Sequence, residues 1–364
     1  MEQVYFLFSS ITFLQLYIPL VIEHARRGHK SVFIIRKNQK PYACPIIHDT
    51  LLNAYAKTYN INLKPFSKYL CTCKKKRIFC KHSLSGIVYM VDGDIYGPSQ
   101  SNVQESMLFH IDMSNATTIS LTENMNYMWT YSHCIEHVDY YNFISSHYVD
   151  TYGFISTKNI YLGSTKYDNI PGATATYKKY GLSETDKHML ILHPKHKYAD
   201  NYNHQHLHEL CRVLKSLGYY VIVKSRPKSN TFLTGDKNVS SDIYPNETLE
   251  LLQACKLCIF FSSSAIDECI FTGTPSINFD IDPKAVQRLT FLKIPSLHTA
   301  VNGFPKVTRK QLKSMIGAML PKHDPRYSQA ANKYMSLGDT APRLADLSET
   351  IFNLKYGTKT QIIS

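Results

Sequence analysis

The 364-residue sequence predicts an α/β fold with two domains, each built around a parallel β-sheet. Short apolar runs alternate with segments that carry apolar residues at helical spacing, which is typical of parallel strands joined by helices. The alternation stops in a polar segment, residues 171–187, and begins again after it. The length of the chain also agrees with about two domains.

In the first half, the apolar runs predict strands that alternate with helices. The stretch from Val4 to Ile22 is interpreted as a buried strand and helix and not as a membrane anchor, because no basic residue precedes it and polar residues interrupt it. The expected strands are Val4–Phe8, Ser31–Ile35, Gly86–Val91 and Thr117–Leu121, with another within Tyr141–Asp150, and the expected helices are Thr12–Arg27 and Asp49–Tyr59.

In the second half the pattern begins again. A helix with four leucines on one face ends at Gly218, a typical C-terminal cap. The expected elements are a strand at His188–Leu192, a helix at His204–Leu217, a strand at Tyr219–Lys224, and a helix, strand, helix and strand within Asn246–Asp282. A last helix begins near Pro342 and places Leu344, Leu347, Ile351 and Leu354 on one apolar face.

Two successive βαβ blocks predict two facing Rossmann-like domains with a cleft between them. The N-terminal domain is expected to cover residues 1–170 and the C-terminal domain residues 171–364. The last helix follows the second domain in sequence, and its apolar face would allow it to pack back toward the first.

Polar groups gather at one turn of the second half, where Ser262, Ser263 and Ser264 follow a buried strand and open a helix. Backbone N–H groups, the positive end of the helix and the hydroxyl groups can all face one anion there, and phosphate suits such a site. An ordinary N-capped turn gives the same sequence, so both interpretations stay open.

The formal net charge of +13 indicates an anionic partner: a nucleotide diphosphate, a nucleic acid or an acidic membrane surface. The basic residues are scattered, and the chain has neither an RNA-binding aromatic signature nor a zinc-finger spacing. A small anionic ligand or a peripheral membrane contact is therefore expected, and nucleic acid is not.

The nine cysteines form no regular framework, which predicts reduced thiols and a cytoplasmic protein. Cys71, Cys73, Cys80 and His82 lie close together in sequence, but their spacing is not a usual zinc pattern. A hairpin with a basic tip is the favoured interpretation, and metal binding by this cluster stays open.

Three segments carry short motifs in a fixed order. Residues 159–169 contain Gly163 and Asp168 after a strand, and residues 221–228 contain Lys224, Arg226 and a proline after another. The third segment, residues 261–267, places the triple serine three positions before Asp267.

In this order the segments resemble the GT-B glycosyltransferases, especially the group of CDP-glycerol glycerophosphotransferases, capsule polysaccharide transferases and UDP-N-acetylglucosamine 2-epimerases. The family patterns are strand-Gly-x-Pro-x-x-Asp, strand-Lys-x-His-Pro and Tyr-Ser-Ser-x-x-x-Asp. This chain departs from them with Thr165 in place of proline and Arg226 in place of histidine. Arginine keeps a donor and can bind phosphate with two hydrogen bonds, so phosphate binding is still expected.

The resemblance implies that the C-terminal domain holds the diphosphate of an activated sugar donor. Lys224 and Arg226 would neutralise its charge, and Asp267 or Glu268 would accept hydrogen bonds from donor hydroxyls. His193 ends the first strand of this domain and would face the same edge, although a solvated loop histidine explains it equally well. The implied donor residues are Lys224, Arg226, Ser262, Ser263, Ser264, Asp267, Glu268 and His193.

The N-terminal half matches the family less well, because Thr122-Glu123-Asn124 stands where related transferases often carry His-Gly. Glu123 is the candidate general base for the acceptor hydroxyl, since burial raises the pKa of a carboxylate in a cleft. Asp94, or its neighbour Asp92, is the rival. Ser9 and Ser10 would line the cleft in this topology. Each of these residues could instead cap a helix.

The predicted function is a metal-independent glycosyltransferase that moves a sugar from a nucleotide-activated donor to the hydroxyl of a glycan, lipid-linked or other acceptor. It needs no cofactor, because the nucleotide sugar is a substrate. Three alternatives stay open. They are a UDP-sugar 2-epimerase-like enzyme, a metal-dependent GT-A-like transferase that uses Asp92 and Asp94, and a non-enzymatic basic binding protein.

Overall fold

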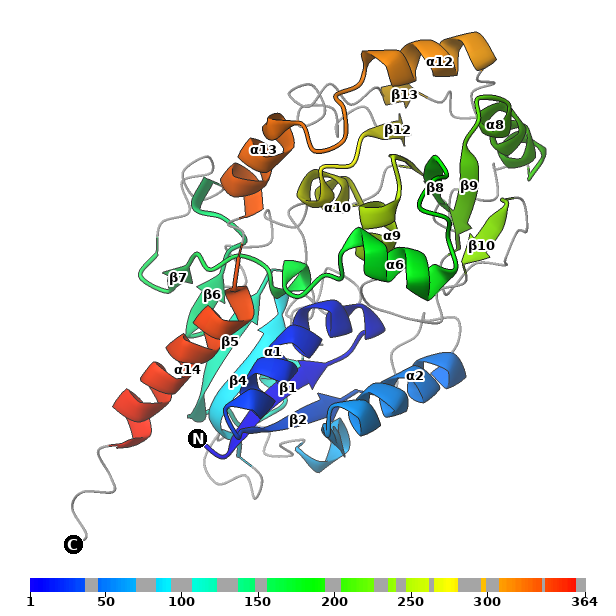
Figure 1. The fold of residues 1–364 in the computed structure, drawn as a ribbon. Helices are drawn as coiled ribbons and strands as arrows, with labels where there is room; N and C mark the ends of the chain where they lie inside the picture. Colours follow the sequence, from blue (N-terminus) through cyan, green and yellow to red (C-terminus); the bar gives the residue numbers. More distant parts are fainter. Residues whose placement is uncertain are drawn as a thin grey trace, which may run out of the picture. The chain divides into compact units, whose positions relative to one another are not determined.

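The computed structural model describes residues 1–36, 45–69, 83–92, 107–122, 137–147, 156–193, 204–225, 235–239, 247–261, 265–280, 296–298, 308–335 and 338–357. The chain divides into two compact units, Met1–Asn169 together with Asn332–Ser364, and Ile170–Ala331. Each unit is built on one parallel sheet with helices packed on it (Figure 1). The α/β fold class predicted from the sequence is therefore confirmed.

The first unit contains a seven-stranded sheet with the order β3-β2-β1-β4-β5-β6-β7. β1 lies inside the sheet, where Val4 is paired with Ser31 of β2 and Ile87 of β4. β3 carries one apolar side chain, Leu63, so no apolar run predicts it. The strands are β1 (Gln3–Phe8), β2 (Lys30–Ile35), β3 (Asn62–Pro65), β4 (Ser85–Val91), β5 (Asn115–Leu121), β6 (Tyr140–Asn142) and β7 (Asn159–Ile160).

The core of the first unit forms where β1 and β2 meet the helix α1 (Leu14–Arg26). The ring of Tyr17 lies 5.1 Å from that of Phe6 and 5.7 Å from that of Phe33, and its hydroxyl donates to the carbonyl of Leu7. The apolar segment from Val4 to Ile22 therefore contributes to the hydrophobic core of the first unit. In the part of the chain that the structure describes, no helix is long and apolar enough to cross a membrane.

Besides α1, the first unit contains two longer helices and four short 3-10 helices among the described residues. The longer helices are α2 (Pro45–Thr58) and the last helix, α14 (Thr340–Tyr356), and the short ones are η1 (Ile11–Phe13), η2 (Phe66–Lys68), η4 (Met107–Phe109) and η6 (Thr165–Tyr167).

The last helix, α14, packs on α1 and β4 within the first unit. The buried carboxylate of Asp168 accepts the backbone N–H groups of Thr340 at 3.2 Å and Ala341 at 2.6 Å, and so satisfies two donors that a helix start leaves open. At the other end, Lys355 donates to the carbonyl of Ala116 at 2.8 Å. Asp168, which matches the aspartate of the strand-Gly-x-Pro-x-x-Asp pattern, therefore anchors the start of α14 in this chain.

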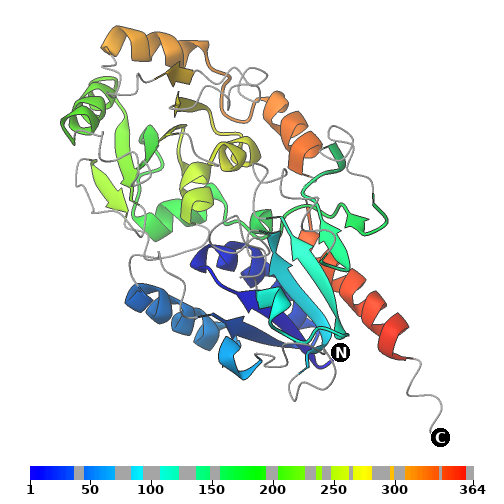
Figure 2. The same ribbon diagram turned by 180° about the vertical axis from the view of Figure 1, so that it is seen from behind.

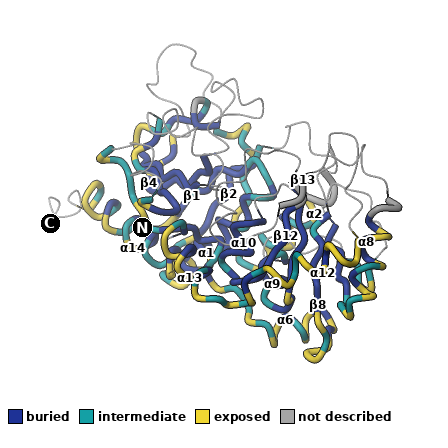
Figure 3. Tube along the Cα trace, turned by 90° about the horizontal axis from the view of Figure 1, so that it is seen from above, coloured by how far each residue is buried: buried dark blue, intermediate teal, exposed yellow. Residues whose placement is uncertain are grey.

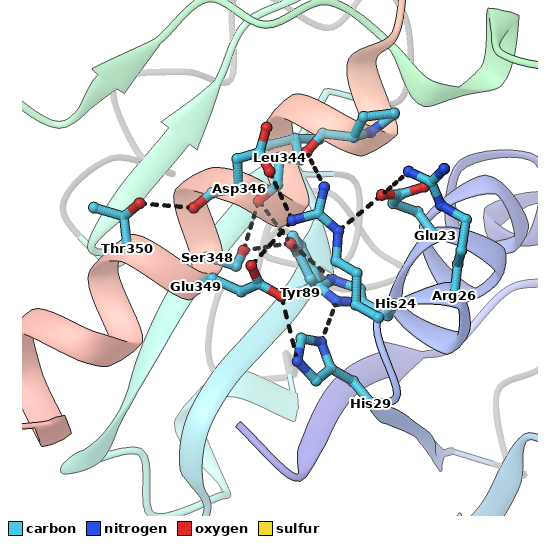
Figure 4. Close-up of polar contacts among 12 residues, drawn as sticks. Glu23, His24, Arg26, His29, Tyr89, Leu344, Asp346, Ser348, Glu349 and Thr350 are labelled. Atoms are coloured by element: carbon cyan, nitrogen blue, oxygen red, sulfur yellow. Dashed lines mark hydrogen bonds and ion pairs between the residues drawn. The ribbon is translucent and has the colours of Figure 1, made fainter.

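Polar contacts fix the middle of α14 against α1 and β4 (Figure 4). Arg27 is paired with Asp346 at 2.6 Å and Glu349 at 3.1 Å. Tyr89 of β4 is hydrogen-bonded to Ser348 and lies 3.3 Å from His24. Burial, reinforced by the nearby His29 and Arg27, lowers the pKa of His24 to about 3, so this network holds a neutral histidine at physiological pH.

The second unit contains a six-stranded parallel sheet with the order β10-β9-β8-β11-β12-β13. The central β8 pairs with β9 and β11, with Ile191 opposite Val223 and Ile259. Its bounds agree with the strand predicted at His188–Leu192. The strands are β8 (His188–Leu192), β9 (Tyr220–Lys224), β10 (Lys237–Val239), β11 (Leu257–Phe261), β12 (Ser276–Asp280) and β13 (Ser296–His298).

Two groups of helices cover this sheet (Figures 1 and 2). α8 and α12 share one core cluster, in which Leu214 and Leu312 pack with Ile259. α6, α9 and α10 form the other group, and Tyr177 of α6 donates to the carbonyl of Ala254. The helices are α6 (Ala173–Tyr180), α8 (His204–Ser216), α9 (Glu247–Ala254), α10 (Ala265–Thr272), α12 (Arg309–Ala318) and α13 (Pro325–Met335), which ends in the first unit.

Burial follows this layering in both units (Figure 3). The central strands are buried, whereas α6 and α14 alternate between buried and exposed positions. On α14, Leu344 is fully buried and Leu354 is 77% exposed, so the predicted apolar face ends before Leu354.

This difference between two leucines of one helix gives a stability prediction. Leu344→Ala should lower the free energy of unfolding of the first unit by about 2–5 kcal/mol, because it leaves a cavity in the core. Leu354→Ala should change it by less than about 0.5 kcal/mol. Urea unfolding followed by circular dichroism measures both, and equal effects of the two substitutions would show that α14 does not pack as described.

Candidate functional site

The strand order of the second sheet identifies where a ligand would bind. Chain connections run from β8 outward to β9 and β10, then return to β11 on the other side of β8. In open α/β sheets, ligands bind outside the carboxyl ends of the strands at this reversal. The residues that follow β8, β9 and β11 are therefore the candidate donor residues in the second unit.

His193 and Lys224 lie side by side at this edge. Leu192 is paired with Lys224 across β8 and β9, and the backbone N–H of His193 donates to the carbonyl of Lys224 at 3.0 Å. His193 is 3% exposed, so it is not the solvated loop histidine of the alternative interpretation. Lys224 is 8% exposed, so the strand end carries a buried cation.

Glu247, at the start of α9, provides the counter-charge for this lysine. Lys224 Nζ lies 3.4 Å from Glu247 Oε2, and both side chains are at most 10% exposed. Burial raises the pKa of Glu247 to about 7, against the opposing effect of Lys224, with Glu250 raising it further and Lys179 lowering it. A carboxylate beside a buried ammonium compensates a charge that would otherwise be costly to bury.

Glu247 was not predicted as a site residue, although it lies within the segment Asn246–Asp282 that contains the triple serine. Its position in the first turn of a helix is common for an acidic residue and carries no functional signal by itself. The pairing with Lys224 joins residues far apart in sequence, so only the tertiary structure reveals it.

Asp267 and Glu268 lie in the first turn of α10 and are 3% and 7% exposed. Their carboxylates are favoured there by the positive end of the helix. Hydrogen bonding of these groups to donor hydroxyls stays a prediction. Arg226 and the residues Ser262, Ser263 and Ser264 lie outside the described residues.

At the carboxyl edge of the first sheet, Ser10 acts as a cap. Its hydroxyl accepts the backbone N–H of Thr12 at 3.4 Å at the start of η1, while Ser9 follows β1 and is half-buried. Asp92 directly follows β4, is fully buried and accepts a hydrogen bond from the hydroxyl of Tyr141 at 2.9 Å. The two candidate general bases, Glu123 and Asp94, lie outside the described residues.

Among the described residues, no group of three or more histidine, cysteine, aspartate or glutamate side chains could hold a metal ion. The cluster of Cys71, Cys73, Cys80 and His82 falls outside them. Four cysteines of the second unit, Cys211, Cys255, Cys258 and Cys269, are buried free thiols.

No protein-family model and no curated protein matches the sequence. Solved structures match over almost the whole chain at low identity. A variant of the wall teichoic acid polymerase TagF is 11% identical, with a TM-score of 0.61 over 97% of this chain and 89% of that one. The UDP-GlcNAc 2-epimerase of Methanocaldococcus jannaschii is 10% identical, with a TM-score of 0.56 over 95% and 99%.

A third similar structure is the spinosyn rhamnosyltransferase SpnG complexed with thymidine diphosphate. It is 10% identical, with a TM-score of 0.55 over 95% of this chain and 100% of that one. These structures have the GT-B fold in common with this chain, as the sequence motifs predicted. A GT-A-like transferase does not fit, because the second half of the chain forms a complete doubly wound sheet of its own. The chain therefore has the two-sheet GT-B architecture of glycosyltransferases and UDP-GlcNAc 2-epimerases.

Proposed function

We propose that this protein is a glycosyltransferase that moves a sugar from a nucleotide-activated donor to an acceptor hydroxyl, without an obligatory metal. The observation that carries the proposal is the buried cation Lys224 at the carboxyl edge of the second sheet, beside the point where the strand order reverses. In an α/β sheet this is where nucleotides bind. Lysine is a suitable partner for a diphosphate.

In the proposed mechanism, the bond between the sugar and the diphosphate breaks, and negative charge develops on the leaving diphosphate. Lys224 would stabilise this charge together with Arg226 and the helix start after Ser262, Ser263 and Ser264. A fixed cation in a water-poor site does so without first reorganising solvent. His193 would help to bind the donor at the same sheet edge. Asp267 or Glu268 would accept hydrogen bonds from donor hydroxyls.

The acceptor hydroxyl must lose a proton as it attacks the sugar carbon. Glu123, with Asp94 as the alternative, is proposed as the general base in the first unit. Ser9 and Ser10 would lie close to the acceptor. A glycan or lipid-linked acceptor is proposed, with a cytoplasmic location and a peripheral membrane contact favoured by the net charge of +13.

A 2-epimerase-like activity is the second candidate, favoured by the match to a UDP-GlcNAc 2-epimerase. Both activities begin with the same nucleotide-bound sugar, so the donor site does not separate them. Incubation with the nucleotide sugar alone does: an epimerase converts it, whereas a transferase forms product only when an acceptor is added. Conversion without any acceptor would favour the epimerase.

A nucleoside diphosphate should stabilise the protein, because a ligand that binds only the folded state shifts the unfolding equilibrium. At a concentration about 100 times Kd the gain is about 2.7 kcal/mol. Thermal-shift measurements with UDP, CDP, GDP, ADP and dTDP test this expectation. No shift with any of them, together with salt-sensitive binding of oligonucleotides, would instead support a basic binding protein.

Lys224→Met should lower kcat/KM for the nucleotide sugar about 10- to 100-fold, since it removes a charged hydrogen-bond donor from the diphosphate. Lys313→Met, at an exposed position of α12 in the same unit, is the matched control and should leave the rate unchanged. Thermal melting verifies that both variants fold. Unchanged kinetics in folded Lys224→Met would exclude Lys224 from the donor site.

A further inference from the structure

The ion pair between Lys224 and Glu247 is looser than its burial suggests. The 3.4 Å separation exceeds the roughly 2.7–2.9 Å of a strong charge-assisted hydrogen bond. No residue of the described chain donates a hydrogen bond to Glu247 Oε2. This oxygen of the buried carboxylate is therefore compensated by the ion pair with Lys224 and not by a hydrogen bond.

The groups around Glu247 come from several elements. Lys224 of β9 opposes its charge most directly, Lys179 of α6 opposes it more weakly, and Glu250 on its own helix adds to it. Lys179 is itself engaged by Glu250, which also accepts a hydrogen bond from Tyr180 at 2.8 Å. His193 adjoins Lys224 at the strand ends.

The neighbouring helix α10 adds no cation on this side. It packs against α9, and its first turn carries Asp267 and Glu268, both acidic. Lys224 is thus the principal charge that favours the ionised form of Glu247. With a pKa of about 7, the Glu247 carboxyl is close to half protonated at neutral pH.

A diphosphate bound at Lys224 would bring further negative charge to the same ammonium. Two anions that compete for one buried cation repel each other, and the weaker acid relieves the repulsion by taking up a proton. A diphosphate keeps its charge more readily than a buried carboxylate, so the proton goes to Glu247.

From this geometry we propose that Glu247 is a positioning residue, which holds Lys224 at the sheet edge and yields it to the donor diphosphate by taking up one proton from solvent. The inference rests on the proposed function, because it needs a diphosphate at Lys224. When the diphosphate leaves, the proton returns to solvent and the ion pair forms again. No other bond forms or breaks.

The proton taken up by Glu247 determines how the affinity for a diphosphate changes with pH. Well below pH 7, Glu247 is already protonated and binding takes up no proton. Above pH 7 the carboxylate must gain its proton on binding, so the affinity for a diphosphate falls as pH rises. Between pH 7 and 8 the loss is at most about tenfold, the limit for one proton.

Calorimetric titration with UDP tests the inference. At pH 7.5, in buffers that differ in their heat of ionisation, the wild type should take up a sizeable fraction of a proton. The Glu247→Gln variant should take up fewer protons on UDP binding, and the difference from the wild type should equal that fraction, because glutamine cannot titrate. Protonation of UDP itself is common to all variants and cancels in the difference. Glu209→Gln, at an exposed position of α8, should behave as the wild type.

From pH 6 to pH 8 the UDP Kd of the wild type should rise about three- to tenfold more than that of Glu247→Gln. Identical proton uptake and identical pH dependence in the two proteins would overturn the role of Glu247 while leaving the donor site intact. No binding of UDP, CDP, GDP, ADP or dTDP to the wild type would overturn the proposed function itself, and the inference with it.

Should Glu247→Gln fail to fold, Glu247→Asp gives an independent test. It keeps a titrating carboxyl close to Lys224, with a side chain one methylene shorter, so a reduced but measurable proton uptake should remain. Loss of the proton uptake in a folded Glu247→Asp protein would contradict the proposal.

Discussion

A lysine at the end of a buried strand needs a counter-charge, and this requirement shapes the proposed donor site. Burial of an ammonium group costs several kcal/mol unless a partner compensates it. In the second unit the partner of Lys224 is Glu247, brought to the strand end by the first turn of α9. The doubly wound strand order places Lys224 beside the carboxyl end of β8, one strand away from β11. Such a site offers the ammonium group of Lys224 to an anionic ligand. In the absence of a ligand, Glu247 compensates the charge of that group.

The first unit depends on a different constraint, the anchoring of the last helix. Asp168 fixes the start of α14, Arg27 and Tyr89 fix its middle, and Lys355 fixes its end. The C-terminal segment therefore completes the core of the unit that contains the N-terminus. The aspartate that matches a family motif has a structural task here, because it binds the two backbone N–H groups at the start of α14.

Sequence periodicity predicted the buried elements well, because burial on both faces gives an uninterrupted apolar run. The strands at Val4–Phe8 and His188–Leu192 illustrate this. It failed where burial is partial: β3 has one apolar residue, and Leu354 continues the spacing of a buried face but is exposed. For the site, motif order predicted Lys224 at the strand end, whereas Glu247 could not be predicted, because its role depends on a contact between residues distant in sequence. Ser10 caps η1, one of the two roles that its residue type left open, and its place in a cleft stays a prediction.

The central claim is that a nucleoside diphosphate binds at Lys224, and a crystal structure of the protein with UDP tests it most directly. The account predicts a phosphate oxygen within hydrogen-bond distance of Lys224 Nζ, next to the carboxyl ends of β8 and β11. A diphosphate bound elsewhere on the protein, away from Lys224 and its ion pair with Glu247, would contradict it.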